Sequence, residues 1–165
     1  MEKKRILRII SICCAICVFV ALTTIVIYTL VNRVGVTTVS LGSEKVASGD
    51  VVEIPLTLKK NHGMWGGQII INYDPEAISF VSCENGDLFD DCEVNNNEGE
   101  VVLLVKQKEL KNMHKNGDIA MLKFKAKVSA DSGDYNIVIN QDTNFGDINE
   151  NIIETIFKNG IISVK

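Results

Sequence analysis

Apolar and charged side chains alternate along residues 119–128, IAMLKFKAKV, and this alternation constrains the possible folds of the chain more than any other feature. Successive side chains of a β-strand point to opposite faces of a sheet, so a period of two indicates a strand with one buried face. On one face we expect Ala120, Leu122, Phe124, Ala126 and Val128; on the other, Lys123, Lys125 and Lys127. The same period places together Val52, Ile54, Leu56 and Leu58, and likewise Tyr135, Ile137 and Ile139. The pattern predicts antiparallel sheets packed face to face.

Clusters of Gly, Asn, Asp and Pro separate the β-branched runs that follow residue 36. These signals predict nine strands, at residues 37–41, 51–58, 68–73, 78–83, 92–95, 100–106, 118–128, 134–141 and 160–165. Residues 106–115 could form either a short turn of helix or a loop. Nine strands within about 130 residues make one all-β sandwich with its own core and no second domain.

A run of 23 uncharged residues, 9–31, precedes this region. At about 1.5 Å per residue, a helix of this length spans the hydrocarbon core of a bilayer. Four basic residues come before the run and only Arg33 follows closely, which keeps the N-terminus inside the cell. The alternative is a cleaved signal peptide, but its apolar core is usually only about 7–15 residues long. We therefore expect a cytoplasmic segment at 1–8, a transmembrane helix at 9–31, a linker at 32–36 and an extracellular domain at 37–165.

The charge balance of the expected outer domain is acidic. Residues 1–31 hold four of the 17 basic residues and one of the 21 acidic ones, which leaves 13 basic against 20 acidic residues. Nucleic-acid binding needs a concentrated basic face, so we expect no nucleic-acid partner.

The five cysteines divide between the two regions. Cys13, Cys14 and Cys17 lie in the apolar run, where cysteine behaves as a small apolar residue. Cys83 and Cys92 lie in the outer domain and bracket the turn-rich octapeptide ENGDLFDD. Disulfides persist outside the cell, so these two cysteines form either a bridge or two free thiols.

A search for catalytic and metal-binding patterns finds no Gly-x-Ser-x-Gly elbow, phosphate-binding glycine loop or His-Glu-x-x-His helix. His62 and His114 are interpreted as surface residues of loops. Four acidic residues could offer oxygen atoms to calcium, but they lack the spacing of a calcium loop: Asp87, Asp90, Asp91 and Glu93. We expect neither an enzyme nor a metal site, and no small-molecule substrate. Trp65, in HGMWGG, is interpreted as a packing residue rather than a platform for a sugar.

Four segments of the sequence follow one another in an order that is more specific than any of the single motifs above. GDVVEIPLTL begins at Gly49, and QIIINYDPEAISFVSCENGD follows from Gln68. GDIAMLKFKAKV begins at Gly117, and NGIISVK ends the chain. This order resembles the cohesin domain, the receptor module of bacterial cellulosomes, over residues 37–165.

The resemblance implies a nine-stranded jelly-roll sandwich that binds the calcium-loaded, helical dockerin modules of other proteins. It implies no cofactor in this chain, because the calcium belongs to the dockerin. Carried over by position, the partner-binding face comprises Gln68, Ile70, Asn72, Asn96, Val102, Leu104 and Lys108, with Val101, Leu103 and Val105 turned to the core. Cohesins often have Asn or Asp where this chain has Gly66 and Gln68, and an acid where it has Lys108, so an unusual dockerin or another partner is expected.

The expected function is therefore a cell-surface binding module that captures a dockerin-bearing protein. Such a partner would be a polysaccharide-degrading enzyme or a scaffold component. Two alternatives stay open: a carbohydrate-binding module of related fold, and a structural or sensory ectodomain. An exposed aromatic strip would favour sugar, whereas a flat face of mixed apolar and polar side chains would favour protein.

Overall fold

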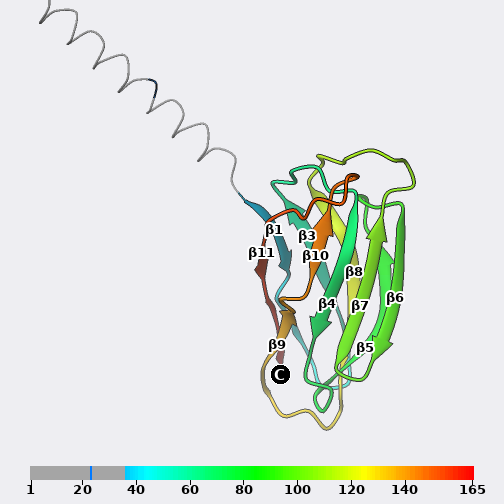
Figure 1. Cartoon of the computed structure of the whole chain (residues 1–165). Coiled ribbons are helices and arrows are strands. Elements are labelled where there is room, and N and C mark those ends of the chain that lie inside the picture. The colour runs from blue at the N-terminus through cyan, green and yellow to red at the C-terminus, as the bar shows by residue number, and fades with distance from the viewer. Residues whose placement is uncertain (1–22, 24–35) are drawn as a thin grey trace, which may run out of the picture. The chain divides into compact units, whose positions relative to one another are not determined.

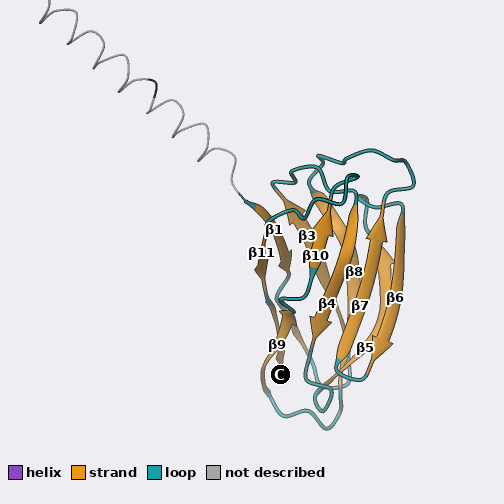
Figure 2. Cartoon of the chain, viewed as in Figure 1, coloured by secondary structure: helices purple, strands orange, loops and turns teal. Residues whose placement is uncertain are grey.

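The structure is a computed structural model that describes residue 23 and residues 36–165. Residues 36–165 contain twelve strands and no helix (Figure 2). The strands are β1 (Thr37–Leu41), β2 (Glu44–Val46), β3 (Val51–Lys59), β4 (Gly66–Asn72), β5 (Ile78–Asn85), β6 (Asp91–Asn97), β7 (Glu100–Lys106), β8 (Gly117–Ala126), β9 (Gly133–Ile139), β10 (Asn144–Gly146), β11 (Thr155–Lys158) and β12 (Gly160–Val164).

Two sheets share these strands. The first has the order β11-β1-β3-β8-β5, and the second has the order β2-β12-β9-β4-β7-β6, with β10 paired to β4 outside this path. Most neighbours are antiparallel, and only the pairs β1–β11 and β2–β12 are parallel. Figure 1 shows β4, β7 and β6 side by side in the second sheet. The prediction of a jelly-roll β-sandwich is confirmed.

The core lies between the inner faces of the sheets. On β3, the alternation buries Ile54, Leu56 and Leu58 completely, as the sequence predicted. On β8, Phe124 is fully buried, and the rings of Tyr73 and Phe80 meet it edge-on, with centroids at 5.5 and 5.6 Å. In the part of the chain that the structure describes, every strand pair and every core residue lies between residues 36 and 165. The sandwich therefore has its own core and can fold without the preceding segment.

All nine predicted strands are present, with ends that differ by at most two residues. The three additional strands, β2, β10 and β11, have only three or four residues each, too few to show a period. The core position predicted for Val128 is wrong, because β8 ends at Ala126 and leaves Val128 82% exposed. Residues 107–116 contain no helix and form a loop.

The predicted membrane helix at 9–31 lies outside the described residues except for Thr23, as do the cytoplasmic segment at 1–8 and the linker except for Val36. Within the described part of the chain, no helix is both long and apolar enough to cross a membrane.

Candidate partner-binding face

The outer side of β4, β7 and β6 forms a continuous face, here called the β4–β7–β6 face. Its two central rows, read across the three strands, are Ile70, Val102 and Asn95, then Gln68, Leu104 and Glu93. Side chains alternate along each strand, so the residues of both rows point away from the core. Leu104 is 46% exposed. The face therefore offers apolar side chains at its centre with polar ones beside them.

The residues between these positions point inward. Val101 and Leu103 have no exposed surface, and Val105 has 3%. The three alternate along β7 with Val102 and Leu104, as the sequence predicted. On β4, Ile69 and Ile71 are likewise fully buried. Burial of one side of these strands leaves Gln68, Ile70, Val102 and Leu104 together on the other.

Polar residues frame the apolar centre at both ends. At one end, the Asn72 side-chain amide donates to Glu100 Oε2 at 3.4 Å, and its oxygen accepts a hydrogen bond from Asn140 at 3.0 Å. At the other end, Lys106 Nζ lies 3.6 Å from Asp91 and 3.9 Å from Glu93. These ion pairs are exposed and add little stability, so the charges stay available to a partner.

Asn96 does not lie on this face. It is paired with Val101, a core position, and its oxygen accepts a hydrogen bond at 3.5 Å from the hydroxyl of Tyr73. A shift of one residue along a strand exchanges the two faces of a sheet, and Asn95 occupies the outward position instead. The residues of β6 that sequence reasoning missed are Glu93 and Asn95. A signal was present in the sequence of β6, DCEVNNN, because Cys92 and Val94 alternate with Asp91, Glu93 and Asn95 and so place the polar residues outward.

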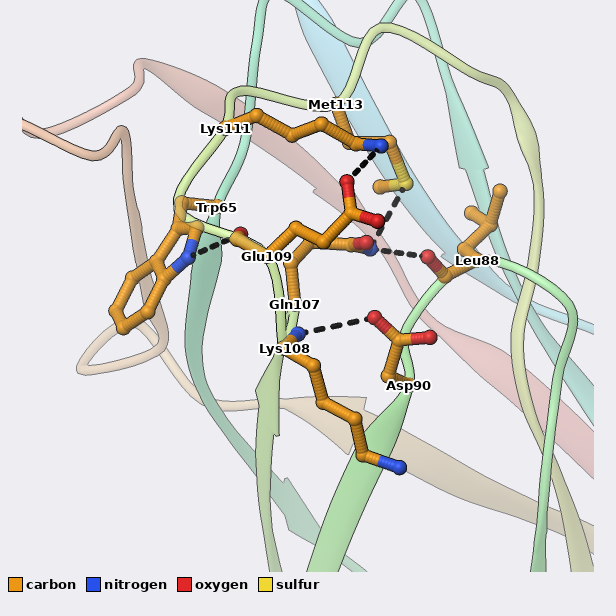
Figure 3. Close-up of polar contacts among 8 residues, drawn as sticks. All are labelled: Trp65, Leu88, Asp90, Gln107, Lys108, Glu109, Lys111 and Met113. Atoms are coloured by element: carbon orange, nitrogen blue, oxygen red, sulfur yellow. Dashed lines mark hydrogen bonds and ion pairs between the residues drawn. The ribbon is translucent and has the colours of Figure 1, made fainter.

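Lys108 lies just beyond the end of β7, in the loop 107–116 (Figure 3). Its backbone N–H donates to Asp90 Oδ2 at 2.9 Å, and its side chain is exposed. The buried Gln107 amide holds the start of the loop, donating to the carbonyl of Leu88 and lying 3.3 Å from Met113 Sδ. The structure therefore places Lys108 at the rim of the β4–β7–β6 face.

Trp65 holds the same loop from the other side. Its indole N–H donates to the carbonyl of Glu109 at 3.1 Å, and its own carbonyl accepts from the N–H of Gln107 at 2.9 Å. These hydrogen bonds tie Trp65 to the loop 107–116, and Trp65 is not among the residues packed against the core.

Gly66 and Gly67 stand at the start of β4, where their neighbours come very close. A Cβ on Gly67 would lie 2.4 Å from the carbonyl oxygen of Asn144 on β10, and one on Gly66 would lie 2.5 Å from that of Val105. Both contacts are with backbone atoms and cannot be relieved by a side-chain rotation. The close approach of β7 to β4 thus explains glycine at position 66, one of the positions where cohesins often have Asn or Asp.

The acidic residues considered as calcium ligands have other partners. Asp87 accepts a hydrogen bond from the backbone N–H of Asp118 at 3.1 Å, and Asp90 accepts the one from Lys108. Among the described residues, no group of three or more His, Cys, Asp and Glu side chains is arranged to hold a metal ion.

Cys83 on β5 and Cys92 on β6 are free thiols in this structure, so the bridge considered from the sequence is not formed here. Both are partly buried against the core. A hydrogen bond between the two side chains and burial raise the pKa of Cys83, and the same hydrogen bond lowers the pKa of Cys92.

A jelly-roll sandwich whose outer sheet face has an apolar centre and a polar frame is typical of β-sandwich binding modules. A profile of the cohesin domain matches residues 37–164, and the chain belongs to the cohesin domain family. No curated protein matches the chain.

Solved structures agree on the fold. The third cohesin of ScaC from Acetivibrio cellulolyticus, solved in complex with the ScaB dockerin, is 24% identical with a TM-score of 0.72, over 78% of this chain and 98% of that one. CaCohA2 from Clostridium acetobutylicum is 22% identical with a TM-score of 0.72, over 79% and 91% of the two chains. A non-cellulosomal cohesin from the archaeon Archaeoglobus fulgidus is 14% identical with a TM-score of 0.69, over 79% and 92%.

Proposed function

We propose that this chain is a receptor module that captures a dockerin-bearing protein on its β4–β7–β6 face. The observation that carries the proposal is the arrangement of Ile70, Val102 and Leu104, which lie together on the outer side of a cohesin sheet. Interfaces between proteins typically have such an apolar centre within a polar rim. Related cohesins have been solved in complex with dockerins.

The composition of the face favours a protein partner over a sugar. Sugar-binding faces present aromatic platforms, and none of the outward-facing residues of β4, β7 and β6 is aromatic: Gly66, Gln68, Ile70, Asn72, Glu100, Val102, Leu104, Lys106, Asp91, Glu93, Asn95 and Asn97. The outer side of the first sheet is different in character, because Lys123 lies 3.1 Å from Glu53 and 2.6 Å from Glu84. An apolar centre on the second sheet makes that sheet the better docking surface.

The place of capture follows from the sequence before the domain. An uncharged run at 9–31 with basic residues before it supports a membrane anchor that holds the domain outside the cell. The partner would then be a secreted polysaccharide-degrading enzyme or a scaffold component held near the cell surface. The chain itself would act without catalysis and without a cofactor, and the calcium would be bound by the dockerin.

The experiment is a capture assay in which immobilised residues 36–165 are offered calcium-loaded dockerin modules, the secreted proteins of the host and, separately, insoluble polysaccharide. Leu104→Asp places an unpaired charge where the partner packs and should weaken capture about a hundredfold or more. Val51→Asp is the matched control, because Val51 is 51% exposed on β3 of the first sheet and the substitution changes the charge equally. Chelation of calcium should abolish capture without changing the melting temperature of this domain.

Three outcomes would contradict the proposal. Equal capture by both variants would place the partner elsewhere on the domain. Retention of insoluble polysaccharide, with no protein, would make the chain a carbohydrate-binding module. Retention of neither would favour a structural or sensory ectodomain.

A further inference from the structure

Cys83 and Cys92 lie on the two strands that form neighbouring edges of opposite sheets. β5 ends the first sheet and β6 ends the second. Cys83 is paired with Leu122 and Cys92 with Val105, and both of these partners are core residues. Since paired residues of antiparallel strands point to the same side, both thiols face into the space between the sheets.

Both cysteines pack against the core while keeping part of their surface in solvent. The two thiols also interact electrostatically, since each shifts the pKa of the other. Only residues 86–90 connect the two strands. The pair therefore lies where the sandwich is open at its edge, within reach of a small reagent.

We propose that Cys83 and Cys92 are a modification site that reacts with a low-molecular-weight disulfide and closes into a disulfide between the two sheets. This bridge would fix the edge strand β6, which carries Glu93 and Asn95 of the β4–β7–β6 face. The proposal depends on the geometry of the two edge strands and not on the identity of any partner.

The reaction balances as two thiol–disulfide exchanges with glutathione disulfide. The thiolate of Cys92 attacks one sulfur, the bond between the two sulfurs breaks, and the first glutathione leaves and takes up the proton given by Cys92. Cys83 then gives up its proton and attacks the sulfur of Cys92, which expels the second glutathione as a thiol. The protein loses two hydrogen atoms, and glutathione disulfide is reduced to two glutathione molecules.

The test uses residues 36–165, which contain the complete core, incubated with glutathione disulfide and then freed of it. Peptide mapping without reduction should find Cys83 linked to Cys92. Closing a loop of about ten residues should raise the melting temperature by about 5–10 °C, and a dithiol should reverse the rise. The single variants Cys83→Ser and Cys92→Ser should each keep one glutathione adduct and show no such rise.

Other results would overturn the proposal. Wild-type protein that carries two glutathione adducts, or none, would show that the thiols do not reach each other. A bridge that leaves the melting temperature unchanged or lowers it would show that the native positions of β5 and β6 do not accommodate the link. The single variants are also controls for misfolding. Each keeps one thiol and cannot form the bridge, so its melting temperature shows the effect of the substitution alone.

Discussion

Leu103 and Leu104 are neighbours of identical chemistry on β7, and truncating each to alanine tests the orientation of the whole strand. Leu103 has no exposed surface, whereas Leu104 is 46% exposed. The substitution removes the same atoms at both positions and leaves the strand propensity equally changed. Any difference in the free energy of unfolding therefore reports which face of the sheet is buried.

The expected magnitudes differ by a factor of about three. Leu103→Ala leaves a cavity in a closed core and should cost about 3–4 kcal/mol. Leu104→Ala leaves no cavity, since solvent or a neighbouring side chain fills the space. With nearly half of the side chain already in water, it should cost about 1 kcal/mol.

The assay is urea unfolding of residues 36–165 followed by circular dichroism, with the slope of the transition compared between variants. An unchanged slope shows that only stability has changed. Equal losses for the two variants, to within about 0.5 kcal/mol, would refute the assignment of the core face. A larger loss for Leu104→Ala would place the β4–β7–β6 face in the interior and end the proposal that it binds a partner.

Three further predictions concern other parts of the chain. A Cβ on Gly86 would lie 2.0 Å from a backbone oxygen of β8, so Gly86→Ala should cost about 1–3 kcal/mol in urea unfolding. Gly133→Ala, where a Cβ meets no atom within 4 Å, should be close to neutral, and equal losses would contradict the packing described here. Hydrogen bonds from the side chain and backbone of Asn151 lower the pKa of Asp147, so this carboxylate stabilises the fold above its unfolded pKa. The difference in melting temperature between wild type and Asp147→Ala should therefore shrink as the pH falls below about 4, and a difference that does not change with pH would exclude this role. If residues 9–31 anchor the chain, protease added to intact cells should remove the domain while an N-terminal tag stays protected, whereas a soluble, N-terminally trimmed product would indicate a signal peptide.

The sequence by itself determined the nine longer strands and which side of most of them is buried. Burial along β3 and β7 follows a period of two, so whether a residue is buried can be predicted from its neighbours along the chain. Val101, Leu103 and Val105 could therefore be assigned to the core before any strand partner was known. The order of turn motifs, including Tyr73-Asp74-Pro75, was enough to indicate the family, because each motif is local.

Only the tertiary structure decided which residues of different strands come together. Glu93 and Asn95 join Val102 and Leu104 on one face because β6 pairs with β7 in this register, and no pattern within β6 predicts which strand lies beside it. Cys83 and Cys92 oppose each other across two sheets because β5 and β6 form adjacent edges, which depends on the packing of the whole sandwich. The physical reason is that strand pairing and sheet packing are contacts between distant segments, and a period within one segment carries no information about its partner.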